Sequence, residues 1–136
     1  MGQRTPEATH LIKVACQAAL GMRDSISIYG TDYETSDGTG IRDYIHIEDL
    51  ASAHASALSY LENGGASTVV NVGYGSGSTV CEVIDVVKKI SGVDFPVIES
   101  PRRPGDPAML VAVADRAQSL LGCRFRFNNL ETIVRD

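Results

Sequence analysis

TVVNVGYGSGSTVCEVIDVVKKISG, residues 68–92, joins an apolar run, a glycine-rich turn and an amphipathic segment. The run at residues 68–72 predicts a short buried strand, because β-branched side chains suit a pleated surface. Residues 78–91 predict a helix, since apolar residues recur at helical spacing and Thr79 and Glu82 form a T-x-x-E capping box. A strand followed directly by a helix indicates an α/β protein.

Outward from this unit, the chain continues to alternate between helix-like and strand-like segments. Few short strands, long loops and a last helix that reaches the final residue predict one end of a larger α/β protein, without internal repeats. The predicted helices cover residues 8–20, 48–61, 115–121 and 130–136, and the further predicted strands cover residues 25–29, 41–47, 95–99 and 111–114. The connecting loops at 30–40 and 101–108 are rich in Gly, Asp, Thr and Pro.

Composition excludes several classes of protein. The 136 residues are 43% hydrophobic and 21% charged, which is ordinary for a folded chain. A net charge of −5 without a basic stripe argues against nucleic-acid binding, and no apolar run approaches the ~20 residues that cross a bilayer. The first ten residues, MGQRTPEATH, lack the apolar core of a secretory signal. We therefore expect a cytoplasmic protein that uses neither nucleic acid nor membrane as a partner.

The cysteines also favour a reducing compartment such as the cytosol. Cys16, Cys81 and Cys123 are odd in number, widely spaced and without a C-x-x-C pair. We therefore expect neither a disulfide framework nor a metal site.

The glycine-rich turn GYGSG at residues 73–77 has two interpretations. Its place between a strand and a helix is that of a dinucleotide-binding fingerprint, G-x-G-x-x-G, but Ser78 stands where the third glycine belongs. No acidic residue ends a second strand at the expected distance downstream. A tight strand-to-helix turn is therefore favoured, although its backbone N–H groups could still face a ligand.

The segment RDYIH at residues 42–46 concentrates polar chemistry. Arg42 offers a planar fork of donors suited to phosphate oxygens, and the alternative is a surface salt bridge with Asp43 or Asp49. His46 is interpreted as a structural donor rather than a catalytic base. Asp49 is interpreted as a helix-start residue, where an acidic side chain is favourable.

The loop PRRPGDP at residues 101–107 carries two guanidinium groups and a carboxylate between prolines. Two arginines can grip a phosphate, and a nearby carboxylate can accept hydrogen bonds from sugar hydroxyls. The prolines reduce the entropy lost on ordering, which favours a preformed binding loop over a solvated charged loop. The sequence contains no G-x-S-x-G, H-E-x-x-H, P-loop or Tyr-x-x-x-Lys motif, so it offers no nucleophile with its base.

Taken together, these segments resemble the UDP-glucose 4-epimerases, a branch of the extended short-chain dehydrogenase/reductase family. The resemblance is carried by THLI at residues 9–12, SIYGTDYETSDGTGIRDYIHIEDLA at 27–51, NVGYGSGSTVCEVI at 71–84 and PRRPGDPA at 101–108. It runs in order over nearly the whole chain. YGTDYETSDGTGIRDYIH is specific to this branch, whereas the PRRxGD pattern is shared more broadly among nucleotide-sugar enzymes.

The resemblance implies an NAD-dependent isomerase of galactose metabolism. In that family a tyrosine takes the proton from the sugar 4-hydroxyl and hydride passes to NAD. The 4-keto sugar then turns over and receives the hydride on its other face. The carboxy-terminal part of the enzyme supplies most of the hold on UDP-glucose or UDP-galactose, and the full-length enzyme is expected to be a homodimer.

The resemblance also places ten positions of this sequence on the UDP-sugar. They are His10 and Leu11 near the phosphates, Ser27, Tyr29 and Val80 beside the uracil, Arg42 and Arg103 on the diphosphate, Tyr44 near the diphosphate and sugar, Asp106 on a ribose hydroxyl, and Leu110 as a gatekeeper that limits sugar bulk. Because Leu110 is a branched aliphatic residue, this position does not decide whether N-acetylated sugars are accepted. Arg102 has no role in the pattern.

In one respect the sequence departs from the family, because the G-x-x-G-x-x-G, the catalytic Ser or Thr and the Tyr-x-x-x-Lys pair are not present. Residues 1–136 are therefore expected to be the carboxy-terminal UDP-sugar-binding portion of an extended Rossmann-fold epimerase, without the amino-terminal NAD-binding part. This portion is expected to hold no NAD and no metal and to be inactive alone. Two alternatives stay open: the corresponding part of another nucleotide-sugar dehydratase or decarboxylase, and a non-catalytic nucleotide-binding module.

Overall fold

The computed structural model describes residues 9–136, and in this part of the chain helices alternate with short strands. The helices are α1 Leu11–Ala19, α2 Ile47–Glu62, α3 Val80–Ser91, α4 Asp115–Leu121 and α5 Leu130–Arg135. The strands are β1 Ile26–Tyr29, β2 Ile41–Arg42, β3 Ser78–Thr79, β4 Val97–Ser100 and β5 Met109–Leu110. The predicted α/β class is confirmed. Of the predicted helix at 8–20, Ala8 lies outside the described residues.

Two small sheets bring distant parts of the sequence together. In the first, β1 runs parallel to β4, with Ile26 opposite Val97. In the second, β2 lies between β3 and β5 and is antiparallel to β3 and parallel to β5. Because β1 and β2 flank the loop at 30–40, and β4 and β5 flank the loop at 101–108, the two pairings set these loops near each other.

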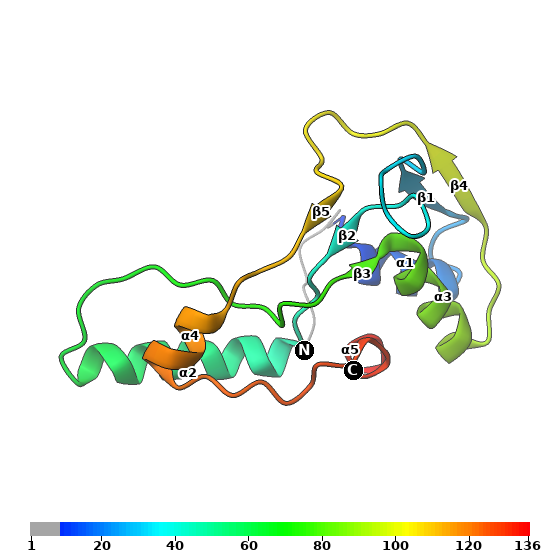
Figure 1. The fold of residues 1–136 in the computed structure, drawn as a ribbon. Coiled ribbons are helices and arrows are strands. Elements are labelled where there is room, and N and C mark those ends of the chain that lie inside the picture. Colours follow the sequence, from blue (N-terminus) through cyan, green and yellow to red (C-terminus); the bar gives the residue numbers. More distant parts are fainter. Residues whose placement is uncertain (1–8) are drawn as a thin grey trace.

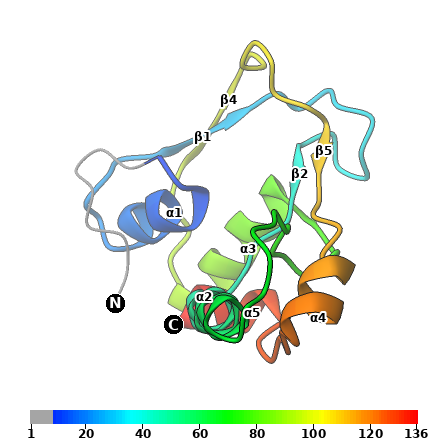
Figure 2. The same ribbon diagram turned by 90° about the vertical axis from the view of Figure 1, so that its left-hand side faces the viewer.

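The main core lies between β1, α1 and α3, and a smaller cluster joins α2 to α4. In Figure 1, β1, β4, α1 and α3 gather on the right, whereas α2 and α4 form an arm on the left. Figure 2 shows α1 and α3 on the same side of β1 and β4. The main core consists of Ala15, Ala18, Ile26, Ile28, Ile84, Val87 and Phe95, and the smaller cluster of Ala53, Ala117 and Cys123.

Helix α3 is fixed at both ends by its own sequence. The Thr79 hydroxyl accepts a hydrogen bond from the Glu82 N–H at 3.0 Å, and the Glu82 carboxylate accepts one from the Thr79 N–H at 2.8 Å. The predicted capping box is confirmed. Gly92 ends the helix with φ of 69°, a left-handed conformation that costs glycine little.

Three strand predictions require correction. Residues 68–72 pair with no other strand among residues 9–136, and Val69 is 82% exposed. The strand predicted at 111–114 lies earlier, at Met109–Leu110, because that is where β2 supplies its partner. Of residues 41–47 only the first two form a strand, since His46 already caps α2. Within the described part of the chain, no helix combines the length and apolar character needed to cross a membrane.

Candidate functional site

A cavity of about 350 Å³ lies where α1, β1, β2, the start of α3 and the loop at 101–107 meet. Its volume falls within the range of roughly 300–1,000 Å³ that is usual for small-molecule sites. Eight of the ten predicted binding positions line it, namely Leu11, Ser27, Tyr29, Arg42, Tyr44, Val80, Arg103 and Asp106. Segments from five places in the sequence thus converge on one cavity.

His10 and Leu110 do not line this cavity. His10 is the exposed N-cap residue of α1, and its carbonyl oxygen accepts a hydrogen bond from the Val14 N–H at 2.9 Å. Leu110 lies in β5 opposite Arg42, with 62% of the residue exposed. The binding roles assigned to these two positions stay predictions.

Arg103 forms part of the cavity wall together with Tyr29. Its guanidinium carbon lies 3.7 Å from the centre of the Tyr29 ring, a cation–π arrangement. The hydrogen bond and the positive charge of Arg103 lower the pKa of the Tyr29 hydroxyl. The tyrosine ring thus holds a cationic group at the edge of the cavity.

Arg42 reaches the cavity from β2. One of its nitrogens donates to the Ile41 carbonyl oxygen at 2.8 Å, and another lies 3.8 Å from the Asp106 carboxylate. Its salt-bridge partner is therefore Asp106, and the alternative of a bridge to Asp43 or Asp49 is wrong. A partly exposed pair at this distance is weak, so the guanidinium retains donors for an anion.

Tyr44 adds a neutral donor to the same wall. Burial raises the pKa of its hydroxyl to about 12, although Arg42 opposes the shift. The hydroxyl is therefore protonated at neutral pH. It can donate a hydrogen bond to a ligand oxygen and does not serve as a base.

The turn at 73–77 is a structural turn, as its sequence favoured. Asp43 accepts hydrogen bonds from the N–H groups of Tyr74 at 3.1 Å, Gly75 at 3.0 Å and Ala112 at 3.2 Å. A side chain at Gly73 would meet Ala112 and Asp43 at 2.6 Å. Two N–H groups that could face a ligand are thus already bonded to a carboxylate. This turn does not fit the pyrophosphate of NAD.

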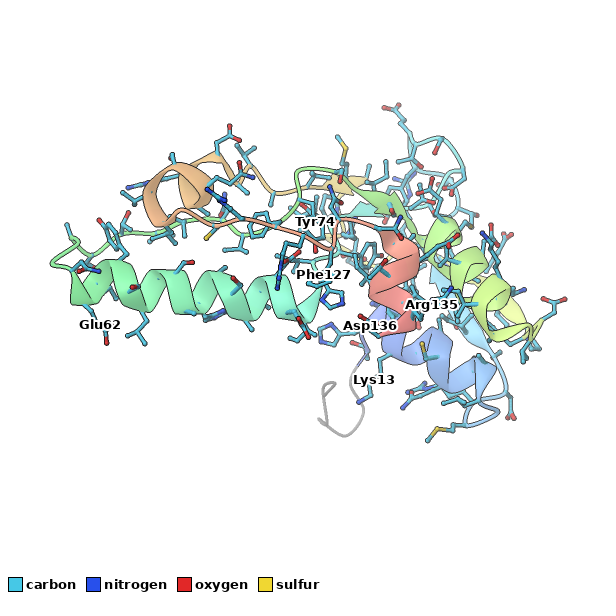
Figure 3. The ribbon with its side chains drawn as sticks, turned by 90° about the horizontal axis from the view of Figure 1, so that it is seen from below. Lys13, Glu62, Tyr74, Phe127, Arg135 and Asp136 are labelled. Carbon is cyan, nitrogen blue, oxygen red and sulfur yellow. The ribbon has the colours of Figure 1, made fainter. Side chains whose placement is uncertain are left out.

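His46 is a structural residue, as predicted. It is only 2% exposed, its Nδ1 accepts the Glu48 N–H at 3.1 Å, and its Nε2 lies 3.1 Å from the Asp136 carboxylate. Its ring stacks on Phe127 with 4.5 Å between centres. Figure 3 shows Phe127 and Asp136 near the start of α2, whose far end carries Glu62. His46 thus fastens the start of α2 to the carboxy-terminal segment.

Asp49 is more than a helix-start residue, which the sequence pattern did not reveal. Its fully buried carboxylate accepts the Tyr74 hydroxyl at 2.7 Å and the N–H groups of Phe127 at 2.9 Å and Arg126 at 3.0 Å. Burial acts to raise the pKa of Asp49, but these donors outweigh it and lower the pKa. The only signal in the sequence is an acidic residue on the apolar face of a predicted helix.

A second polar network, also missed, fastens the loop at 30–40 to α3. The Asp37 carboxylate accepts the Thr39 N–H and hydroxyl, both at 2.8 Å, and the Thr79 hydroxyl at 2.5 Å. Burial opposes the shift, yet these donors lower the pKa of Asp37. The network holds the loop whose residues Tyr33 and Gly40 line the cavity.

The two arginines of the loop at 101–107 face different partners. Arg102 does not line the cavity; its Nε lies 2.6 Å from the Asp32 carboxylate, and its guanidinium lies 4.1 Å from the centre of the Tyr33 ring. The idea that both arginines of this loop grip one phosphate is therefore wrong. Arg103 shares the cavity with Arg42 instead. Among residues 9–136, no group of His, Cys, Asp and Glu has the arrangement of a metal site.

Comparison with known proteins agrees with this architecture. The sequence model of the NAD dependent epimerase/dehydratase family matches residues 1–73, more than half of the chain. The chain belongs to this family.

Its relatives within the family carry a narrower name. A UDP-glucose 4-epimerase of Azospirillum brasilense is 54% identical over 134 residues, which are 98% of this chain and 38% of that protein. The UDP-glucose 4-epimerase of Brucella ovis, solved with NAD, superposes with a TM-score of 0.93 at 41% identity, over 99% of this chain and 42% of that one. The UDP-glucose 4-epimerase of Bifidobacterium longum, solved with NAD⁺ and UDP, gives 0.84 at 34% identity, over 96% and 38%. The chain thus spans about two fifths of the length of these relatives.

Proposed function

We propose that this chain supplies the UDP-sugar-binding portion of a UDP-glucose 4-epimerase, the isomerase that interconverts UDP-glucose and UDP-galactose in galactose metabolism. The observation that carries the proposal is the meeting of Arg42, Arg103, Asp106 and Tyr29 in one cavity. Three of these four are positions that the family resemblance assigns to the diphosphate and ribose. The Bifidobacterium longum relative, solved with UDP, supports the same ligand.

The chemistry of the cavity suits a nucleoside diphosphate. The protein carries a net charge of −5, so it must meet a diphosphate with local positive charge. Arg42 and Arg103 provide that charge, and Arg103 is held against the Tyr29 ring. The Asp106 carboxylate accepts hydrogen bonds from ribose hydroxyls. Val80 offers apolar surface to the pyrimidine, and Leu11 lines the same cavity at the position that the resemblance places near the phosphates.

We assign NAD and the catalytic tyrosine to a part of the protein outside these residues. The basis is that the turn at 73–77 does not fit a pyrophosphate and that the chain spans about two fifths of its relatives. When bound, NAD supplies the hydride acceptor. This chain binds and orients the UDP group while the hexose stays free to turn. We further propose that the full-length protein is a homodimer and that it is cytoplasmic. The three free cysteines are consistent with a reducing compartment such as the cytoplasm.

Calorimetric titration of UDP into the chain tests the proposal. A charge-assisted hydrogen bond to phosphate contributes roughly 1.5–3 kcal/mol, so Arg42→Ala and Arg103→Ala should each weaken binding by about tenfold to a hundredfold. Arg124→Ala is the matched control, because Arg124 is an exposed arginine outside the cavity. Arg102 is not a suitable control, because its guanidinium contacts the ring of Tyr33, which lines the cavity. If Arg124→Ala lowered the affinity for UDP as much as Arg103→Ala, the effect would come from the net charge of the protein and not from a specific contact.

A further inference from the structure

The hydroxyl of Tyr33 is a buried polar group without a partner. Tyr33 is 7% exposed, and within residues 9–136 its hydroxyl oxygen makes no hydrogen bond. Leaving such a group unpaired costs roughly 1–3 kcal/mol, so buried hydroxyls normally have partners. An unsatisfied group that persists in a well-packed place points to a partner supplied by something that binds there.

The surroundings of Tyr33 fix its ring at the cavity. Tyr33 lines the same cavity as Arg42 and Arg103. The Arg102 guanidinium covers the ring at 4.1 Å from its centre and is itself paired with Asp32 at 2.6 Å. A side chain at Gly30 would come within 2.7 Å of the ring, and Gly30 has a φ of 87°, so only glycine fits beside it. The ring has little freedom to turn its hydroxyl elsewhere.

The loop backbone adds a second restraint. The Tyr33 N–H donates to the Gly38 carbonyl oxygen at 2.9 Å, and the Asp37 network ties the same loop to α3. The ring is thus held from both sides, by the arginine on its face and by the loop behind it. This is the arrangement of a preorganised binding group, in which the restraint is made before the ligand arrives.

We propose that Tyr33 is a further ligand-binding residue of this cavity, whose hydroxyl hydrogen-bonds an oxygen of the bound nucleotide, and that Arg102 is the positioning residue that holds its ring in place. The inference rests on the proposed function and adds two residues to it. It also gives a reason for the two arginines of the loop at 101–107 to point in different directions. Arg103 lines the cavity itself, whereas Arg102 holds the ring of Tyr33, which lines the cavity.

The test is Tyr33→Phe in the whole 136-residue chain, measured by calorimetric titration with UDP and with uridine and by thermal melting without ligand. Loss of one neutral hydrogen bond should weaken UDP binding by about threefold to tenfold. The melting temperature should stay the same or rise, because the ring remains and an unpaired buried hydroxyl is gone. Arg102→Ala should weaken binding as well. Tyr60→Phe, a tyrosine on α2 outside the cavity, is the control and should leave affinity unchanged.

The two ligands locate the bond. Equal weakening for UDP and uridine assigns it to the nucleoside, and weakening for UDP alone assigns it to the diphosphate. Unchanged affinity in Tyr33→Phe, with Arg103→Ala still impaired, would overturn the inference and leave the proposed function standing. A melting temperature that falls together with affinity would show a structural role only and also overturn it. No UDP binding by the parent chain would overturn both.

Discussion

Replacing the buried carboxylate of Asp49 should destabilise the fold severely while leaving the shape of the side chain almost unchanged. In Asp49→Asn an amide NH₂ takes the place of one of two oxygens that both accept hydrogen bonds, from Tyr74, Arg126 and Phe127. Bonds to a charged acceptor contribute roughly 1.5–3 kcal/mol and neutral ones roughly 0.5–1.5 kcal/mol. Weakening three donors by about 1 kcal/mol each gives a loss of about 2–4 kcal/mol.

Urea unfolding followed by circular dichroism measures this loss as a lower midpoint at unchanged slope. Asp85→Asn is the matched control, because Asp85 is an exposed acidic residue on α3. A surface change of that kind stays within roughly ±0.5 kcal/mol. If the free energies of unfolding of Asp49→Asn and Asp85→Asn differ by less than about 0.5 kcal/mol, the Asp49 carboxylate does not stabilise the contact of α2 with the turn at 73–77 and with residues 126–127.

The pH dependence of unfolding, the association of the chain and its lack of turnover can each be measured as well. The pKa of Asp49 is lowered below 3.8, so its contribution to stability is complete above about pH 4 and is lost as pH falls through the folded pKa; urea midpoints from about pH 6 to about pH 3 should fall less steeply in Asp49→Asn. Exposed Leu58, Leu61 and Val69 should make the chain self-associate, seen in light scattering as a mass that rises with concentration; a strict monomer would contradict this. The 136-residue chain with NAD should convert no UDP-galactose, because it has no Tyr-x-x-x-Lys pair to move the proton; turnover above a buffer blank would show the reverse.

Local patterns were sufficient for the elements that carry their own signals. The capping box of Thr79 and Glu82 and the left-handed Gly92 lie at the two ends of α3, so the sequence predicts where the helix ends and predicts its start to within two residues; residues 78–79, predicted as helix, form β3 instead. The alternation at residues 25–29 likewise predicts β1, because its apolar side chains enter the main core. These predictions need no knowledge of distant contacts.

Pairing, in contrast, depends on partners that local patterns do not show. Residues 68–72 have a strong strand composition, yet they form no strand in residues 9–136, where no neighbour supplies backbone hydrogen bonds. The strand at Met109–Leu110 has little strand signal and exists because β2 lies beside it. Propensity is a weak guide where a ladder partner decides the outcome.

The candidate site shows the same division. Family resemblance named eight residues that the fold does gather in one cavity, although they come from separate segments. It did not assign Tyr33 or Arg102, because the burial of Tyr33 and the contact of its ring with Arg102 depend on the packing of two loops that are distant in sequence. Asp43 and Asp49 act on backbone N–H groups far away in sequence, which no spacing rule predicts.

We propose that Arg103 holds the diphosphate of a UDP group in this cavity. The most direct measurement is the ratio of the uridine Kd to the UDP Kd, in the parent chain and in Arg103→Ala, at one fixed salt concentration. UDP should bind more tightly than uridine to the parent, and the ratio should shrink by about tenfold to a hundredfold in the variant. An unchanged ratio would place the diphosphate away from Arg103 and refute this assignment.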